Sequence, residues 1–365
     1  THGKVWIALS IFVLASLCPF AKAGPAQMGS AAAMVVETAR EIPLAYDVDV
    51  VVAGGSLAGV EAACAAAEQG ASVLLVDSRP YIGYDLCGSQ QLWLNQDDIP
   101  ETALTKALFG NKRVVTPLDA KCVLDQALLK HNVQFLTGSY PAELLVGADE
   151  TPSGMTIANR SGRQAVRAKV VIDATANAVL ARQSAAQFAP FKPGTKEFTF
   201  TVVGGDLQDG SHGKQVPDVL FESGLWQKKK KTNVRYPVYE YTFPVEYRAD
   251  TFRERSKALN RIRSSVYDPK MVDHSEQLLY TPDHVVLGGI RPRGIDNLYV
   301  LNAYSGEQKN PIAFARTGQQ IGQEAAARAK RIAVSDGLKY SRATDAKQNL
   351  SLIHISEPTR LWSGS

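Results

Sequence analysis

The sequence predicts an α/β fold, a parallel sheet with flanking helices and a β-hairpin layer, together with an inserted α+β segment. Three observations predict it. Residues 47–53 are a β-branched run that leads into a glycine-rich turn and an alanine-rich helix. A second buried run, 169–176, and a short strand before a capped helix lie much further along the chain. Apolar runs of this kind, separated by helices, are typical of parallel strands covered on both faces.

Length and composition describe an ordinary globular chain. Its 365 residues are 45% hydrophobic, 21% charged and 8% aromatic, which excludes disorder, collagen and coiled coil as descriptions of the whole. Lys and Arg number 40 against 36 Asp and Glu, a net charge of +4. No basic stripe is interleaved with aromatic residues, so we expect no nucleic-acid partner. We interpret the one dense basic run, 228–231, as a solvated loop.

The two ends are expected to lie outside the fold. An apolar run begins at Val5, and Ala21-Lys22-Ala23 has the small-x-small pattern of a cleavage site, so residues 1–23 are interpreted as a secretory signal peptide. The run is shorter than the ~20 residues that span a bilayer. We therefore expect a secreted or periplasmic protein without a membrane span after cleavage, exported by the Sec or the Tat route. Residues 24–46 are interpreted as a leader. Residues 350–365 resemble the translation of a sequencing adapter and are left out of the fold prediction.

The first strand, turn and helix carry the strongest chemical signal. The strand 47–53 leads into Gly54-Gly55-Ser56-Leu57-Ala58-Gly59, and a helix over 60–69 follows and stops at Gly70. A second strand, 72–76, ends in Asp77. This order within about 30 residues is typical of a dinucleotide-binding βαβ unit.

Each position has a physical role in such a unit. Gly54 permits the tight turn, and Gly59 lets the helix approach the strand closely. The free N–H groups at the start of the helix would face a pyrophosphate. Asp77 lies 23 residues after Gly54, near the ~20 expected for a carboxylate that accepts hydrogen bonds from an adenosine ribose. Because the carboxylate would repel a 2′-phosphate, NADP is disfavoured. Ser56 stands at the middle glycine position of the pattern, where its hydroxyl can donate to a phosphate.

The remaining elements follow from periodicity and capping signals. Asn310 and Pro311 are a strong helix start, at the N-cap and the first helical position. Gly204-Gly205 and Gly288-Gly289 are interpreted as turns, because no alanine-rich helix and acid-terminated strand follow them. The further elements predicted are helices over 119–130, 179–187, 252–266 and 310–331, strands over 133–136, 169–176, 196–204, 235–247 and 297–301, and a hairpin that turns at 160–162.

The segment Asp47 to Arg79 resembles the opening of the FAD-dependent oxidoreductases of the glutathione-reductase-like group. Within that group it is most similar to the broad "FAD dependent oxidoreductase" family, whose turn often reads Gly-Gly-Ser or Gly-Gly-Thr. Asp173-Ala174-Thr175 resembles the second flavin motif, and the strand 297–301 with the helix from Pro311 resembles the third. The resemblance covers roughly residues 47–329.

The resemblance implies a Rossmann-like FAD-binding domain over 47–185 and 294–335, with an inserted substrate or cap domain over 186–293. It implies FAD as the cofactor, with the N-terminus of the last helix directed at the flavin pyrimidine. The cofactor-binding residues that it implies are Gly54, Gly55, Ser56, Leu57, Ala58, Gly59, Asp77, Ser78, Arg79, Ala174, Thr175, Glu307, Pro311 and Ile312.

Catalytic residues are not identified by any motif, and four side chains are weak candidates. Cys87 lies where the disulfide reductases of the group carry redox cysteines, but Leu92 occupies the partner position, so a packing thiol is the default interpretation. His274 and His284 can act as bases or simply pack. Arg291 can hold a substrate carboxylate or form a surface ion pair. The scattered cysteines of the mature chain, without a CxxC pair, indicate no metal site.

The function predicted is that of an exported FAD-dependent oxidoreductase. It would take hydride from a small organic substrate onto flavin N5. Because no NADH domain is predicted, electrons would leave for oxygen, a quinone or a partner protein. Two alternatives stay open: an NAD-binding dehydrogenase, and a non-catalytic nucleotide-binding protein. The substrate, the electron acceptor, the oligomeric state and covalent attachment of the flavin are not predicted.

Overall fold

A computed structural model describes residues 41–208, 212–227, 232–307 and 310–341. The predicted signal peptide, the basic run 228–231, the stretch 350–365 and residues 24–40 of the leader lie outside the described residues. The predicted boundary of the leader at residue 46 is wrong, because the first strand already begins at Leu44. The chain divides into units of residues 1–41 and 42–365, and the description below concerns the second. Within the described ranges no helix is long and apolar enough to cross a membrane.

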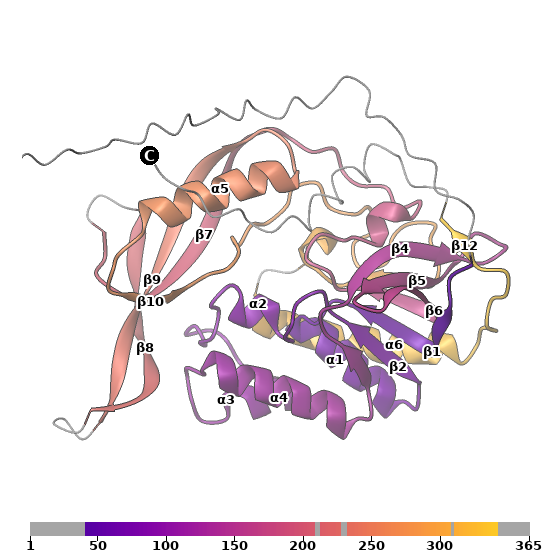
Figure 1. Cartoon of the computed structure of the whole chain (residues 1–365), viewed down its shortest axis with the longest axis horizontal. Coiled ribbons are helices and arrows are strands. Elements are labelled where there is room, and N and C mark those ends of the chain that lie inside the picture. The colour runs from indigo at the N-terminus through magenta and orange to yellow at the C-terminus, as the bar shows by residue number, and fades with distance from the viewer. Residues whose placement is uncertain (1–40, 209–211, 228–231, 308–309, 342–365) are drawn as a thin grey trace, which may run out of the picture. The chain divides into compact units, whose positions relative to one another are not determined.

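The larger sheet has eight strands (Figure 1). Its order is β12-β4-β5-β6-β1-β2-β3, with β11 also paired to β6. Strand β6 changes partners along its length: residues 162–167 pair antiparallel with β5, and residues 171–173 pair parallel with β11. A parallel section and a hairpin layer therefore share one strand, which confirms the predicted fold class. The bounds are β1 Leu44–Ala53, β2 Val73–Val76, β3 Gln134–Leu136, β4 Tyr140–Val146, β5 Pro152–Asn159, β6 Gly162–Asp173, β11 Leu298–Val300 and β12 Lys339–Tyr340.

Helices α1 and α6 pack backbone to backbone against the parallel section. A Cβ atom on Gly318 would lie 2.3 Å from the Ala58 carbonyl oxygen, and one on Gly322 would lie 2.1 Å from that of Ala62. Such close approach requires glycine at both positions. The first two turns of α1 therefore lie against the middle of α6. The helices are α1 Leu57–Glu68, α2 Tyr84–Cys87, α3 Ala103–Phe109, α4 Pro117–Lys130 and α6 Pro311–Ala329.

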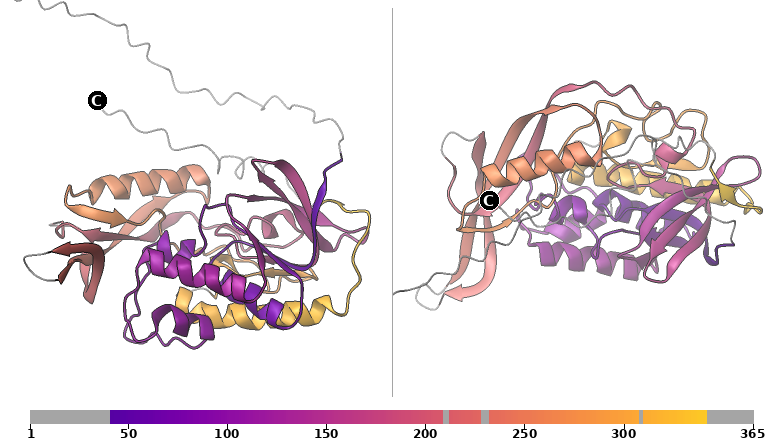
Figure 2. Two further views of the ribbon diagram at one scale, coloured as in Figure 1. Left: turned by 60° about the horizontal axis from the view of Figure 1, so that its bottom comes forward. Right: turned by 45° about the horizontal axis from the view of Figure 1, so that its top comes forward.

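The second sheet has four strands in the order β10-β7-β9-β8, and α5 packs near it (Figure 2, right). Its strands are antiparallel, and its core is aromatic, with Phe198, Phe200, Tyr241 and Tyr247 almost fully buried. Ile262 of α5 completes this cluster. The bounds are β7 Gly194–Gly204, β8 Gly213–Gln227, β9 Thr232–Tyr247, α5 Phe252–Ser265 and β10 Met271–His274.

The predicted helix over 179–187 is wrong. Only a 3₁₀ turn forms there, η1 Ala181–Gln183. The carboxylate of Asp173 accepts hydrogen bonds from the backbone N–H groups of Leu180 and Ala181, both at 2.9 Å, and Ala178 adopts a left-handed φ of 51°. A contact from the end of β6 therefore outweighs the helical propensity of this alanine-containing stretch.

Candidate functional site

The glycine-rich turn after β1 has the geometry that the sequence predicts. Gly54 has a φ of +105°, and a Cβ atom there would lie 2.3 Å from the Ala174 carbonyl oxygen. A Cβ atom on Gly59 would lie 2.4 Å from the Gly54 carbonyl oxygen. Ser56 is the N-cap of α1, because its Oγ accepts from the Gly59 N–H at 3.1 Å. Its hydroxyl oxygen thus stabilises the helix start, so α1 begins three residues earlier than predicted.

Asp77, at the end of β2, turns its carboxylate towards this turn. Oδ2 accepts from the Gly55 N–H at 2.5 Å, and Oδ1 accepts from the Arg79 N–H at 2.7 Å. The side chain is buried, and the loss of solvent raises the pKa of Asp77 although both hydrogen bonds oppose that shift. Each oxygen keeps a lone pair for another donor. The carboxylate thus lies beside the turn, where the predicted ribose contact requires it, but it is only 2% exposed.

Asp85 occupies the N-terminus of α1, which the sequence analysis did not anticipate. Both of its carboxylate oxygens accept from the Leu57 N–H, each at 3.0 Å. Asp85 comes from α2, where Tyr84 donates to the Ala174 carbonyl oxygen at 3.4 Å and lies 5.4 Å below the Arg79 guanidinium. Burial raises the pKa of Asp85 to about 7.

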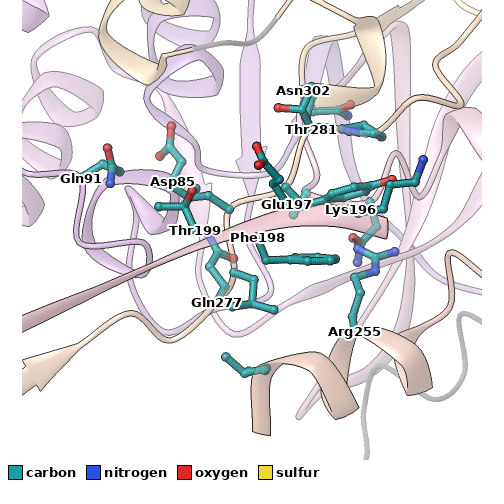
Figure 3. Close-up of a pocket in the computed structure, with 18 of the residues that line it drawn as sticks. Asp85, Gln91, Lys196, Glu197, Phe198, Thr199, Arg255, Gln277, Thr281 and Asn302 are labelled. Carbon is teal, nitrogen blue, oxygen red and sulfur yellow. Dashed lines mark hydrogen bonds between the residues drawn. The ribbon is translucent and has the colours of Figure 1, made fainter. Parts of the chain in front are cut away.

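A cavity of about 940 Å³ adjoins these residues. One wall comes from the larger sheet and its helices and includes Arg79, Asp85, Asn302 and Pro311. The opposite wall comes from the second sheet and α5 and includes Phe198, Thr199, Thr242 and Arg255. Figure 3 shows Asp85 and Gln91 at one end of the cavity and Arg255 at the other. The volume lies in the range of ~300–1,000 Å³ that small-molecule and cofactor sites occupy.

The predicted cofactor residues are spread over three places. The turn residues and Leu57, Ala58 and Asp77 gather at the start of α1, where α2 and Asp85 border them. Ala174 and Thr175 follow β6, and Thr175 donates to Asp173 at 2.6 Å. Pro311 and Ile312 open α6, where Asn310 caps the helix by accepting from the Ile312 N–H. Of the fourteen predicted residues, only Arg79 and Pro311 line the cavity. The other twelve do not, among them Ser78, which is half-buried, and Glu307, which is exposed.

A buried carboxylate network joins the two walls. Asp250 accepts hydrogen bonds from His284 Nε2 at 2.6 Å, Tyr304 Oη at 2.7 Å and Tyr247 Oη at 2.8 Å. The guanidinium groups of Arg182 and Arg255 lie 3.1 and 3.2 Å from it. Burial opposes ionisation, but the hydrogen bond from His284 and the charge of Arg255 outweigh it and hold the pKa of Asp250 well below its usual range. Asp250, Arg182, Arg255 and Tyr304 line the cavity.

The four weak catalytic candidates do not line the cavity. Cys87 is buried, and burial raises the pKa of its thiol to about 12. His274 stacks on Phe200, with Nδ1 2.9 Å from the Ser275 carbonyl oxygen. His284 is engaged by Asp250. Arg291 pairs with Glu324 at the surface. In the part of the chain that the structure describes, no group of His, Cys, Asp and Glu is arranged to hold a metal ion.

Fold and cavity together define a nucleotide-binding α/β protein with a second sheet over its ligand cavity. The model of the FAD dependent oxidoreductase family matches residues 49–258, more than half of the chain. The chain belongs to this family of FAD-dependent enzymes, and the match favours FAD over NAD as its cofactor.

Solved structures with a similar fold include two hydroxylases and a reductase-like protein, all at low identity. The aromatic hydroxylase CabE from angucycline biosynthesis is 14% identical, with a TM-score of 0.49, over 78% of this chain and 63% of that one. The anhydrotetracycline hydroxylase OxyS from Streptomyces rimosus is 13% identical, with a TM-score of 0.47, over 79% and 63%. A geranylgeranyl bacteriochlorophyll reductase-like protein from Thermoplasma acidophilum is 15% identical, with a TM-score of 0.47, over 85% and 84%. The chain thus spans less than two thirds of both hydroxylases. The search of curated proteins found no match.

The residues present fit FAD at two of its three sections. The Asp77 carboxylate has the chemistry and the position of a ribose ligand, although it is buried and does not line the cavity. The cavity has the volume and the mixed polar and aromatic lining of a ring-binding site. At the third section, the N-terminus of α1 that suits a diphosphate already holds a carboxylate of the chain itself.

Proposed function

We propose that this enzyme transfers hydride from a small organic substrate to its flavin, with the substrate held between the flavin motifs and the second sheet. FAD supplies N5 as the hydride acceptor. The observation that carries the proposal is the joint lining of one cavity by Arg79, Asn302 and Pro311 on one wall and Phe198 and Arg255 on the other. A ligand in this cavity would contact both the cofactor-binding part and the inserted part of the chain.

Residues of the cavity walls and of the neighbouring turn would have distinct roles. Asp77 would hold the ribose, and the capped N-terminus of α6 would stabilise negative charge near it. On the substrate side, Phe198 packs on Tyr280 with ring centroids 5.0 Å apart, which provides an aromatic floor that excludes water. Arg182 and Arg255 carry two positive charges against the single charge of Asp250, so this end of the cavity favours an anionic or electron-rich substrate group.

The test is optical. The visible spectrum of the protein as purified is recorded before and after acid precipitation, which reports cofactor identity and covalency. The protein is then loaded with FAD and desalted. Anaerobic mixing with a panel of hydroxy acids, amino acids and amines is expected to bleach the flavin band with at least one donor. Remixing with oxygen or with a soluble quinone then identifies the acceptor by the faster recovery of colour. Flavin that is bound but reduced by no donor of the panel would favour the non-catalytic alternative.

A variant in the cavity wall formed by the second sheet separates effects on substrate binding from effects on FAD binding. Thr242 lines the cavity from the middle of β9, so Thr242→Ile narrows it while keeping a β-branched residue in the strand. We expect a higher half-saturating concentration of the donor that bleaches the flavin, with an unchanged FAD spectrum and affinity. Equal donor kinetics in both proteins would contradict the proposed substrate position.

We also propose that the enzyme is exported. The pattern of residues 1–23 supports this. Expression of the gene with its native leader, followed by fractionation and N-terminal sequencing, is expected to give a mature chain that begins at Gly24. An uncleaved chain in the cytoplasmic fraction would contradict export.

A further inference from the structure

The start of α1 is closed by a side chain of the protein. Asp85 presents both carboxylate oxygens to the Leu57 N–H, the first residue of the helix. The residue is 6% exposed and also borders the 940 Å³ cavity. Before α2, the Gly83 N–H donates to the Gly55 carbonyl oxygen at 2.7 Å, and after it the Gly88 carbonyl oxygen accepts from the Glu276 N–H at 2.7 Å. Asp85 therefore stands on a short helix that is held in place at both ends.

This position conflicts with an anionic cofactor. A helix N-terminus stabilises one negative group through its free N–H donors and its positive dipole end. The diphosphate of FAD carries two negative charges and belongs at the same helix start in dinucleotide-binding units. Two anions in a partly dry site repel each other strongly, because the local dielectric is low. An ionised Asp85 and a bound diphosphate thus disfavour one another.

We propose that Asp85 takes up a proton when FAD binds, so that the affinity of the chain for FAD falls as the pH rises above neutrality. As a neutral acid, Asp85 keeps an acceptor for the Leu57 N–H and gains an O–H donor that suits an anionic neighbour. The inference rests on the FAD dependence of the family and is independent of the substrate proposed above.

The surroundings of Asp85 place its titration near neutral pH. Burial raises its pKa to about 7, the backbone N–H groups of residues 57, 85 and 86 oppose that shift, and the negative charge of Asp77 adds to it. No cation is paired with it among the described residues, since the guanidinium of Arg79 is bonded to Glu276. The charged or titratable groups that face this region from the surrounding elements are Asp77, Arg79, Tyr84, Cys87, Lys121, Asp173, Asp273 and Glu276.

The experiment measures the Kd for FAD by quenching of flavin fluorescence between pH 6 and pH 9. If only the neutral form of Asp85 is compatible with bound FAD and its pKa is about 7, the Kd of the unmodified chain rises about 100-fold over this range. Asp85→Asn keeps the shape and the acceptor oxygen but carries no charge at any pH. It is expected to give a flat profile and to bind FAD more tightly than the unmodified chain at pH 9.

Glu61→Gln is the matched control. Glu61 is also buried on α1, and burial likewise raises its pKa to about 7, but it accepts from Thr102 and does not line the cavity. Its variant is expected to retain the steep rise of the unmodified chain. A rise that survives in Asp85→Asn, or one that disappears in Glu61→Gln, would overturn the proposal.

Calorimetry of the unmodified chain tests the same point without a variant. In buffers of different ionisation enthalpy, FAD binding at pH 8 is expected to take up about 0.9 proton, the ionised fraction of a group with a pKa of about 7. Binding without proton uptake would overturn the proposal alone. No FAD binding by any of the proteins at any pH would overturn the cofactor assignment with it.

Discussion

Replacing Asp250 by Asn should destabilise the fold more than any other single charge removal in the cavity wall. The carboxylate accepts from His284, Tyr304 and Tyr247 and pairs with two guanidinium groups, while its side chain is 5% exposed. These partners come from both walls of the cavity. The substitution keeps the volume but leaves Arg182 and Arg255 without a counter-charge.

The magnitude follows from that burial. Removing one partner of a buried ion pair costs about 3–5 kcal/mol, because the remaining charge is left uncompensated. The side chains of Arg182 and Arg255 are 19% and 29% exposed, so solvent can relieve part of the cost and the lower end applies. At about 2 °C for each kcal/mol in a chain of this size, the Tm is expected to fall by about 6 °C.

The sign of the pH dependence is also determined. The pKa of Asp250 is depressed in the fold, so its stabilisation is present above the unfolded value of 3.8 and is lost as the pH falls further. The difference between the two proteins should therefore stay constant from pH 8 to about pH 5 and shrink only in stronger acid.

Urea unfolding followed by tryptophan fluorescence and circular dichroism measures the difference. Asp283→Asn is the control, because that carboxylate also faces His284 but is 30% exposed and pairs mainly with Lys196. It should cost about 1 kcal/mol or less. Equal losses in the two variants, or a loss below about 1 kcal/mol for Asp250→Asn, would refute the view that the network is a buried charge cluster.

Three further outcomes are expected. Gly318→Ala places a Cβ atom 2.3 Å from the backbone of α1, which cannot move aside. The urea midpoint should therefore fall by an amount equivalent to about 1–3 kcal/mol. An unchanged midpoint would contradict the close packing of the two helices. Glu61→Gln should stabilise the fold by about 3 kcal/mol at pH 9 and by less than about 1 kcal/mol at pH 5, because ionising a carboxyl whose pKa is raised on folding from 4.5 to about 7 destabilises the fold as the pH rises. A difference that does not depend on pH would argue against this. Cys122 is exposed, whereas burial raises the pKa of Cys64 and Cys87 to about 12. Maleimide should therefore label Cys122 before Cys64 and Cys87, which peptide mass spectrometry can show. Early labelling of Cys64 or Cys87 would disprove their burial.

The first βαβ unit was predictable because its signals are local. A β-branched run, a glycine at a left-handed φ, an alanine-rich helix and a terminal acid follow one another in sequence, and the structure pairs β1 with β2 and turns Asp77 onto Gly55. Strand β8 was not predictable in the same way, since Pro217 and Gly224 interrupt its pattern. Strand β8 tolerates Pro217 because it lies at the edge of the second sheet, where the absence of one backbone N–H donor costs little.

The Asp250 network shows why polar clusters escape such reasoning. Its members lie between residues 182 and 304, with no spacing that belongs to a helix or a strand. Each residue taken singly is compatible with an exposed loop. These side chains are buried only when the second sheet packs against the larger one, and their burial converts six ordinary side chains into one charged unit.

Asp85 makes the same point for the cofactor site. In the segment 84–88 the sequence points to Cys87, because the disulfide reductases of the group carry redox cysteines there. The thiol of Cys87 is buried and does not line the cavity. The carboxylate two residues earlier reaches the helix start that a diphosphate needs. Whether an acidic residue helps or opposes an anionic ligand depends on which amide it accepts from. That information lies in the position of α2 relative to α1, which short-range sequence patterns do not contain.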